Sequence, residues 1–315
     1  MKKSLIALAV IGFSGAAMAQ SSVTLYGVAD AGIGKIKSGS LLNPPANDSS
    51  NKTEFISGSR MNNGTSRLGV RGVEDLGGGL KAGFNFETGL DLDNGNADST
   101  FWQRAANLWV GGNWGTFKMG RSLTPSFYSN AAYELTGTAN YSVLGNTYNY
   151  TGYGARHNSA FSYKTPNMGG FSAEVAYITK ADHSNAAKWD LGLIYANGPI
   201  GAGLSANKTK GGKTNTALGA KYNFGNFAVA ANYNNVYSTT GQRRRGFGLG
   251  GSATFGAASV TLDLTRDTKN EWHGKKYTNG VVEAKYALSK RTFVYGAYLR
   301  LNGDNNYGIG MRHNF

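Results

Sequence analysis

The chain has 315 residues, a formal net charge of +14, 46 glycines and no cysteine. Without cysteine a disulfide framework is excluded, so backbone pairing or a large core must stabilise the fold. Glycine is about twice as frequent as the ~7% usual in globular proteins, and no long window shows the apolar periodicity of a helix, which argues against a helical fold.

The N-terminus has the three parts of a secretory signal peptide. Lys2 and Lys3 precede the apolar run 5–13, and small residues follow at 17–19. The apolar run is well short of the ~20 residues that a spanning helix needs. We therefore expect residues 1–19 to be a cleaved signal peptide and residues 20–315 to form one exported domain.

The rest of the chain consists of segments of about ten residues in which apolar and polar side chains alternate. A period of two indicates β-strands, and this length suits a tilted strand that crosses a bilayer. We expect sixteen strands, at 22–36, 60–73, 79–91, 103–112, 115–121, 156–165, 170–180, 188–197, 199–208, 214–224, 226–237, 244–255, 257–268, 277–288, 291–301 and 305–315.

The connections between these segments alternate in length. The tight ones are 74–79, 112–115, 165–170, 197–199, 224–226, 255–257 and 288–291. The others are mostly longer and polar: 37–59, 92–102, 122–155, 181–187, 209–213, 238–243, 269–276 and a short one near Asn302. Short turns at one end and long loops at the other are typical of an outer-membrane barrel.

The two faces of the strands agree with this interpretation. In one strand Leu218 and Tyr222 share a face, while Lys221 and Asn223 share the other. Charges on every strand cannot enclose a dry core, because an unpaired buried charge is too costly. An apolar outside in lipid and a polar, water-filled inside remove the conflict. We therefore predict an all-β fold, a transmembrane antiparallel β-barrel of about sixteen strands, wide enough for an aqueous channel.

Several stretches resemble the Gram-negative general-diffusion porins of the β-proteobacterial branch. They lie at 22–33 (SVTLYGVADAGI), 66–89 (SRLGVRGVEDLGGGLKAGFNFETG), 115–121 (GTFKMGR), 155–171 (ARHNSAFSYKTPNMGGF), 286–298 (YALSKRTFVYGAY) and 307–315 (YGIGMRHNF). The resemblance implies a homotrimer in the bacterial outer membrane and a third extracellular loop folded into the lumen. The terminal Phe315 resembles the membrane-assembly signal of such barrels.

The third loop, residues 122–155, is the longest break in the alternation. Loops of this length are unusual unless they are functional or disordered. This one is rich in tyrosine and asparagine, and its one charged residue is Glu134. We expect it to fold inward, largely because the family pattern has such a loop.

Parity and family position place more bases than acids inside the barrel. The expected lumen bases are Arg67, Arg71, Lys81, Lys118, Arg156, Lys164, Lys180, Lys221, Lys285 and Arg312, and the acids are Glu87, Glu174, Asp190, Asp263 and Glu283, with Asp30 as a further candidate. A basic lining selects for anions. The sequence therefore predicts an anion-selective channel for small hydrophilic solutes, both anionic and neutral.

The resemblance places an arginine cluster at Arg67, Arg104 and Arg156, with Glu134 facing it from the third loop. Strict alternation turns Arg104 outward, so its place in this cluster requires a bulge. The residues expected along the pore and its constriction are Arg67, Arg71, Lys81, Glu87, Arg104, Lys118, Arg121, Glu134 and Arg156.

Other functional classes have weaker support. The G-x-G-x-x-G pattern at 246–251 lacks a surrounding βαβ unit, so nucleotide binding is not expected. The three arginines at 243–245 suit a solvated loop that meets lipopolysaccharide phosphates better than a nucleic-acid site. The four histidines have no metal-ligand spacing, and no G-x-S-x-G elbow is present. We expect no enzyme activity, no cofactor, no metal and no nucleic-acid partner.

Two alternatives stay open from the residues. One is an outer-membrane anion channel that is specific for a substrate, and the other is a barrel that serves as an adhesin or receptor. Membrane lipid and lipopolysaccharide are the expected surroundings in each case.

Overall fold

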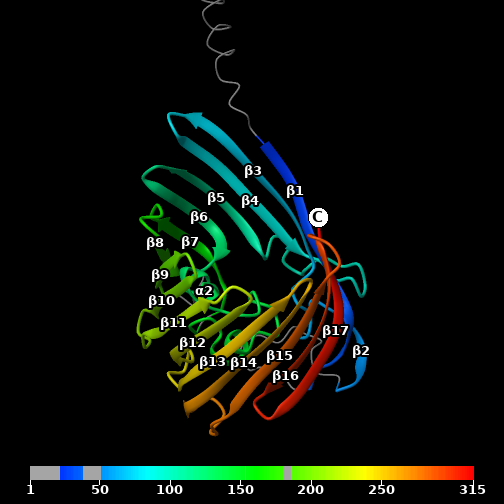
Figure 1. Cartoon of the computed structure of the whole chain (residues 1–315). Coiled ribbons are helices and arrows are strands. Elements are labelled where there is room, and N and C mark those ends of the chain that lie inside the picture. Colours follow the sequence, from blue (N-terminus) through cyan, green and yellow to red (C-terminus); the bar gives the residue numbers. More distant parts are fainter. Residues whose placement is uncertain (1–21, 38–50, 153, 181–185) are drawn as a thin grey trace, which may run out of the picture.

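The computed structural model describes residues 22–37, 51–152, 154–180 and 186–315. The expected signal peptide, residues 1–19, lies outside the described residues. Figure 1 shows strands that follow one another in chain order around a barrel, with β1 and β17 side by side where the wall closes.

Seventeen antiparallel strands form one sheet. They are β1 (Ser22–Lys35), β2 (Thr53–Ser57), β3 (Arg67–Gly77), β4 (Leu80–Gly89), β5 (Ala105–Gly112), β6 (Gly115–Leu123), β7 (Arg156–Lys164), β8 (Phe171–Ile178), β9 (Lys188–Asn197), β10 (Ile200–Thr209), β11 (Asn215–Asn223), β12 (Phe227–Tyr237), β13 (Arg243–Phe255), β14 (Ala258–Asn270), β15 (Thr278–Ala287), β16 (Thr292–Leu301) and β17 (Asp304–Asn314). Because β1 pairs with β3 over 22–28 and with β2 over 31–35, β2 and β3 share one position in the wall. The wall therefore has sixteen positions, and the expected closed sixteen-stranded barrel is confirmed.

One strand begins later in the structure than the sequence predicts. The sequence predicts a continuous strand over 60–73, but β3 begins at Arg67 and residues 58–66 leave the wall. Asn62 is fully buried, and its Nδ2 donates to Asp30 Oδ1 at 3.2 Å. The backbone N–H of Gly64 donates to Asp30 Oδ2 at 2.7 Å. The Asp30 carboxylate thus holds this segment inside, and it satisfies the Gly64 N–H, which a strand would pair with a neighbouring strand.

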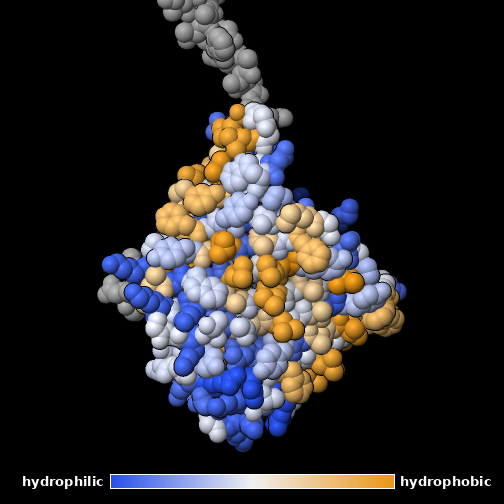
Figure 2. All heavy atoms as spheres, turned by 90° about the vertical axis from the view of Figure 1, so that its left-hand side faces the viewer, coloured by the Kyte–Doolittle hydropathy of each residue, from blue (hydrophilic) through white to orange (hydrophobic). Residues whose placement is uncertain are grey.

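The two faces of the wall differ in the predicted way. Leu249, Leu262 and Ile309 are 63%, 48% and 66% exposed, whereas Asp263 and Glu283 on the opposite parity are 4% and 2% exposed. Figure 2 shows apolar side chains across the middle of the outer wall and hydrophilic ones at the lower end of the view. An apolar outer band is the surface that a bilayer requires, since lipid cannot solvate exposed polar groups.

The tight turns lie together at one end of the barrel, and aromatic side chains gather there. Ring pairs form between Trp114 and Tyr163, Phe171 and Tyr195, Tyr222 and Phe224, and Phe227 and Phe255. Most of these rings are at least a third exposed. Exposed aromatic residues at strand ends suit the interface between lipid and water.

The C-terminal residue completes the closure at this end. The N–H of Phe315 donates to the carbonyl oxygen of Gly27 at 3.1 Å, and the N–H of Gly27 donates back at 3.0 Å. A Cβ at Gly27 would lie 2.3 Å from the ring of Phe315, so only glycine leaves room for it. The assembly role of Phe315 stays a prediction.

The long connection between β6 and β7 contains two short helices, α2 (Pro125–Ala131) and α3 (Val143–Tyr148). Thr124 caps α2 by accepting from the N–H of Phe127, and Ser142 caps α3 by accepting from the N–H of Gly145. Helix α2 packs on β9 and β10, and α3 packs on β14, β15 and β16. No helix among the described residues is long and apolar enough to cross a membrane.

Glycines in the wall allow this connection to approach closely. A Cβ at Gly203 would lie 2.0 Å from the carbonyl oxygen of Ser129, and one at Gly201 would lie 2.4 Å from that of Ala132. At Gly219 it would meet the ring of Tyr133 at 2.6 Å. Part of the high glycine content therefore serves the contact between wall and loop, because any larger residue would push α2 away.

Candidate functional site

Two cavities lie inside the barrel and share part of their lining. The first measures about 450 Å³ and is lined mainly by residues 58–67 and 123–156. The second measures about 630 Å³ and is lined mainly by β1, β3, β4, β5 and β6. Four residues line both cavities and mark their junction: Arg67, Arg104, Leu123 and Arg156.

The three arginines reach the junction from strand ends on the loop side. Arg67 is the first residue of β3, and Arg156 is the first of β7. Arg104 lies just before β5, and its backbone N–H donates to the carbonyl oxygen of Glu87 at 3.1 Å. Because Arg104 precedes the strand, strict alternation does not fix its direction, and its side chain lines both cavities.

One carboxylate faces this group of guanidinium groups. Arg104 Nε donates to Glu87 Oε1 at 2.6 Å, and Arg67 Nη1 lies 3.9 Å from the same oxygen. Arg156 Nε donates to the backbone oxygen of Arg104 at 2.9 Å. This acceptor is uncharged, so the bond does not neutralise the Arg156 charge. Tyr26 donates its hydroxyl proton to Glu87 Oε2 at 2.9 Å. The junction therefore keeps an excess of positive charge.

The first cavity is basic on one side. Its lining, as far as the structure describes it, contains five arginines and neither aspartate nor glutamate; the arginines are Arg60, Arg67, Arg104, Arg156 and Arg312. Arg312 Nη1 donates to Asn63 Oδ1 at 2.8 Å, which fixes its position. The buried Nε of Arg67 has no hydrogen-bond partner among the described atoms. Low-dielectric walls strengthen the field of such a group on any entering ion.

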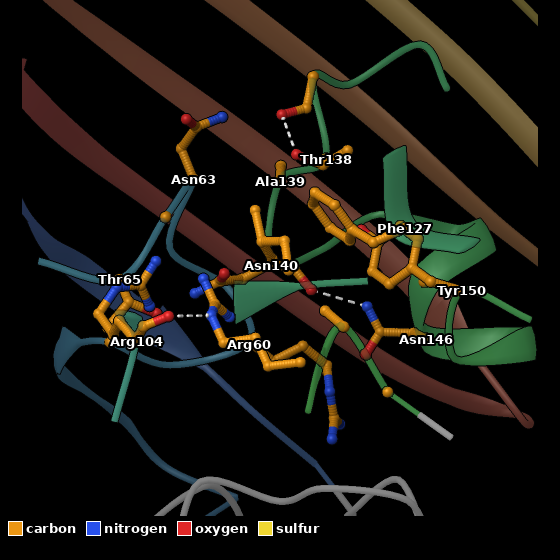
Figure 3. A pocket seen from close by; sticks show the side chains of 18 of the residues that line it. Arg60, Asn63, Thr65, Arg104, Phe127, Thr138, Ala139, Asn140, Asn146 and Tyr150 are labelled. Carbon is orange, nitrogen blue, oxygen red and sulfur yellow. Dashed lines mark hydrogen bonds between the residues drawn. The ribbon is translucent and has the colours of Figure 1, made fainter. Parts of the chain in front are cut away.

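The other side of the first cavity is aromatic. Phe127 and Tyr150 form an edge-to-face pair with ring centroids 4.9 Å apart, and both line the cavity. Figure 3 shows this pair beside α2, with Arg104 on the far side of Asn140 in the same view. Burial raises the pKa of the Tyr150 phenol, and the Glu134 charge raises it further. Tyr150 is therefore neutral at physiological pH and adds no negative charge.

The second cavity combines bases with aromatic rings. The guanidinium of Arg71 lies 5.2 Å from the ring centroid of Tyr26, and Lys118 Nζ lies 5.9 Å from that of Tyr128. Lys118 Nζ also lies 3.4 Å from Glu174 Oε1. Burial is the main cause that raises the pKa of the Tyr128 phenol. The acid in the described lining of this cavity is Glu87.

The structure places three expected site residues away from both cavities. The expectation that Glu134 faces the arginines is corrected. Its carboxylate accepts from the Thr136 hydroxyl and the Thr138 N–H, both at 2.6 Å, so the local turn binds it and it is buried. Lys81 is exposed near a tight turn, and Arg121 bonds to Asn158 and the backbone of residue 103. Neither Lys81 nor Arg121 lines either of these two cavities.

Some residues line the first cavity without having been predicted beside the arginine cluster. The sequence places Arg60 within a strand, and only the inward turn of 58–66 brings it to the cavity. Arg312 is predicted in the lumen but not beside the arginine cluster. The pair of Phe127 and Tyr150 has no sequence signal beyond the aromatic content of the loop, because loop residues have no periodicity that gives their direction.

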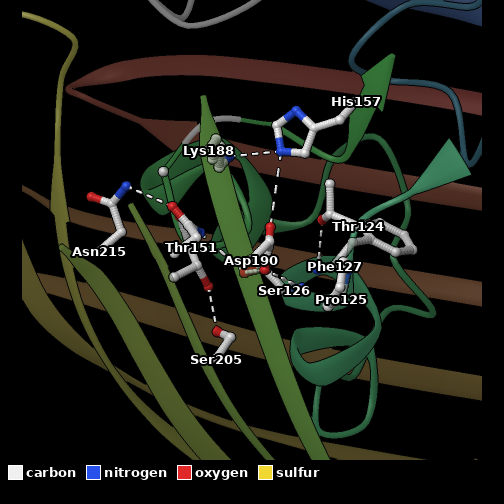
Figure 4. A network of polar contacts seen from close by, with 12 residues as sticks. Thr124, Pro125, Ser126, Phe127, Thr151, His157, Lys188, Asp190, Ser205 and Asn215 are labelled. Carbon is white, nitrogen blue, oxygen red and sulfur yellow. Dashed lines mark hydrogen bonds and ion pairs between the residues drawn. The ribbon is translucent and has the colours of Figure 1, made fainter. Parts of the chain in front are cut away.

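A buried polar network fixes the loop against the wall (Figure 4). Asp190 Oδ1 accepts from the N–H of Ser126 at 3.1 Å and from its hydroxyl at 2.5 Å. Lys188 Nζ lies 2.6 Å from His157 Nε2, which lies 3.9 Å from Asp190 Oδ2. Thr151 shares a hydrogen bond of 2.7 Å with Ser205. The start of α2 and the return of the loop are thus tied to β9 and β10.

The described residues contain no group of three or more histidine, cysteine, aspartate or glutamate side chains arranged to hold a metal ion.

Comparisons with known proteins agree with this architecture. The Gram-negative porin family model matches residues 4–306. The chain is 36% identical to outer membrane porin protein 32 of Delftia acidovorans, over 99% of this chain and 93% of the relative. It is 31% identical to an outer membrane porin protein of Bordetella pertussis, over 88% of this chain and 72% of the relative. The solved structure of an anion-selective porin from Comamonas acidovorans superposes with a TM-score of 0.76 at 28% identity, covering 94% of this chain and 100% of that one.

Proposed function

The chain belongs to the Gram-negative porin family, and on that premise we propose that its lumen is a general-diffusion channel that prefers anions. The location is the bacterial outer membrane, where the apolar outer wall meets lipid. Small hydrophilic solutes, anionic or neutral, pass from one cavity to the other through the junction of Arg67, Arg104 and Arg156.

The observation that carries the anion preference is the charge of the first cavity. Five arginines line it, and no acid stands among the described residues of its lining. A cation at the junction is repelled by the guanidinium groups, and Glu87 is the neighbouring acid that offsets this repulsion in part. An anion is attracted. Rings of Lys and Arg give such selectivity in other channels. The similarity to the anion-selective porin from Comamonas acidovorans supports the same assignment.

The connection between β6 and β7 is proposed to be the third extracellular loop and to narrow the lumen. In support, α2 and α3 pack on the wall, and side chains of the connection bond to the polar face that carries Asp190, Ser205 and Glu283. Leu123, Phe127 and Tyr150 line the first cavity opposite the arginines.

We also propose a homotrimer, as expected for the family, and contact between basic loops and lipopolysaccharide phosphates. Arg243 and Lys269 lie at the loop end of β13 and β14 and can present positive charge to phosphate. A heat-sensitive oligomer in mild detergent tests the assembly. A mass of one barrel alone would contradict it.

The channel proposal is tested by the reversal potential of the reconstituted protein under a KCl gradient. The wild type should prefer chloride, and Arg67→Glu or Arg156→Glu should shift the preference towards potassium. The preference should weaken with salt, because the Debye length falls from ~10 Å at 0.1 M to ~3 Å at 1 M. Lys276→Glu makes the same charge change on an exposed loop outside both cavities and should change little.

Two results would overturn the assignment. One is cation preference in the wild type. The other is an unchanged reversal potential in both arginine variants while their oligomers remain as heat-stable as the wild type.

A further inference from the structure

We propose that the first cavity holds a saturable site for planar aromatic carboxylates, in which the arginine side binds the carboxylate and the pair Phe127–Tyr150 contacts the ring. This inference rests on the proposed channel function and names a solute class for it. The juxtaposition that supports it is visible in Figure 3, where the aromatic pair and Arg104 flank the same space.

The cavity has the size of a small-molecule site. Its volume of about 450 Å³ lies within the range of roughly 300–1,000 Å³ typical of ligand pockets. Such pockets combine apolar and aromatic lining with a few placed polar groups. A one-ring carboxylate is small enough to enter and large enough to touch both sides.

The arginine side keeps guanidinium charge that the protein does not fully pair. The Nε of Arg67 is buried without a partner among the described atoms, and its Nη1 has only the long contact of 3.9 Å to Glu87, so the charge of Arg67 is weakly neutralised. Arg156 uses its Nε for the backbone oxygen of Arg104, and no ion pair within 4.0 Å is seen for it in the described part of the chain. The planar guanidinium fork can bind a carboxylate through two parallel hydrogen bonds.

The aromatic side is held in place independently of any ligand. The N–H of Phe127 donates to the Thr124 hydroxyl at 3.0 Å in the first turn of α2. Tyr150 follows the left-handed cap residue Asn149, and its ring packs on Phe127 with an interplanar angle of 62°. Both residues are part-exposed and line the cavity, so their rings can contact a third ring. Aromatic rings prefer such offset or edge-to-face contacts.

The asparagine side-chain amides at the edge of the first cavity help to determine how a bound carboxylate is oriented. The side-chain nitrogens of Asn140, Asn146 and Asn149 donate to the backbone oxygens of Ser59, Asn140 and Gly152 at 2.9, 2.7 and 2.6 Å. Because each of these amide nitrogens already donates at least one hydrogen bond and carries no charge, a carboxylate gains more at the charged arginines than at this rim. The acid group therefore turns to the arginines, and the ring turns to Phe127 and Tyr150.

A base beside an aromatic ring is also found further towards the tight-turn end of the barrel. In the second cavity Tyr128 lies within 6.0 Å of both Lys118 Nζ and Lys164 Nζ, measured to the ring centroid. A ring that leaves the first cavity therefore meets another base beside another aromatic face. This arrangement gives an aromatic anion a path of weak contacts, as conduction requires.

The test uses block of the chloride current in planar bilayers by three probes: benzoate, cyclohexanecarboxylate and succinate. Cyclohexanecarboxylate has the same charge and nearly the same size as benzoate but no aromatic ring. Benzoate should block in a saturable way, and at a lower concentration than either other acid. In Phe127→Leu the half-blocking concentration of benzoate should rise about two- to tenfold, the worth of one aromatic contact. That of cyclohexanecarboxylate should change little.

Controls separate this inference from the channel proposal and from misfolding. Tyr150→Phe keeps the ring and should retain benzoate block, whereas Phe161→Leu removes a ring from the outer wall and should behave as the wild type. Absence of chloride preference in the wild-type channel would refute the channel proposal. Chloride preference with equal block by benzoate and cyclohexanecarboxylate, or an equal rise for both acids in Phe127→Leu, would overturn the aromatic site alone.

Discussion

Arg104 Nε and Glu87 Oε1 lie 2.6 Å apart at the junction of the two cavities. Arg104 comes from the residue before β5 and Glu87 from inside β4, so strand pairing itself brings them together. Glu87 is thereby the one described acid beside three arginines, and it sets how much positive charge the junction keeps.

Removing that acid should strengthen the anion preference. In Glu87→Gln the one amide oxygen can still accept from Arg104 Nε, while the amide nitrogen faces the Tyr26 hydroxyl oxygen as a donor, and the side chain carries no charge. The reversal potential in a KCl gradient should move further towards the chloride limit. Glu271→Gln, on an exposed loop, is the matched control. A shift towards potassium in Glu87→Gln would contradict this account of the junction.

The Tyr141 hydroxyl should stabilise the loop between β6 and β7. It donates to Glu283 Oε2 at 2.6 Å and accepts from Asn63 Nδ2 at 2.8 Å. Tyr141→Phe leaves both buried groups short of a partner, with an expected cost of about 1–3 kcal/mol. Thermal unfolding in detergent should begin at a lower temperature than in the wild type, and single-channel records should show more closures. Tyr298→Phe, on the exposed outer wall, should match the wild type; an equal loss there would refute the local explanation.

The wall glycines should be required for the position of α2. Gly203→Val places side-chain atoms where the carbonyl oxygen of Ser129 now lies, only 2.0 Å from an added Cβ. We expect a changed conductance or a large loss of folded protein. At Gly251 an added Cβ has 3.5 Å to its nearest neighbour, so Gly251→Ala should fold and conduct normally. Normal conductance in Gly203→Val would show that the loop does not depend on this contact.

The orientation of the barrel can be tested with single cysteines, since the chain has none of its own. We expect the tight turns to face the periplasm and the longer loops to face outward. In intact cells a maleimide attached to a polymer too large for the channel should label Lys276→Cys, in the loop between β14 and β15, but not Asn226→Cys, in a tight turn. Both should react after lysis. Labelling of residue 226 in intact cells would contradict this orientation and indicate the opposite one.

Acid should loosen the link between two loops. Hydrogen bonds from Lys269 and from the N–H of Arg243 lower the pKa of Glu271 below its ordinary value. A depressed pKa stabilises the folded link above the ordinary glutamate pKa, and this contribution is lost as pH falls through the folded value. The hydrogen-exchange protection of the Arg243 amide should therefore drop at low pH. Glu271→Gln should remove this pH dependence, and equal dependence in the variant would contradict the assignment.

The barrel was predictable from the sequence because strands have a strict period of two. The alternation around Leu218 and Lys221 gives each side chain a face, and charge cannot occupy the lipid face. The lengths of the turns and loops then order the two ends. These regularities recur from strand to strand, so sixteen wall positions and a basic interior followed without coordinates.

The junction was decided by tertiary structure, because its parts lie where that period stops. Arg104 precedes its strand, Arg60 sits in an inward turn held by Asp30, and Glu134 is bound by its own turn rather than by the arginines. A loop side chain takes its direction from whichever partners the fold brings near, and those are distant in sequence. The alternation of side chains along the chain thus determined a basic water-filled barrel, and only the packing of the loop determined that an aromatic wall, not an acid, faces the arginines.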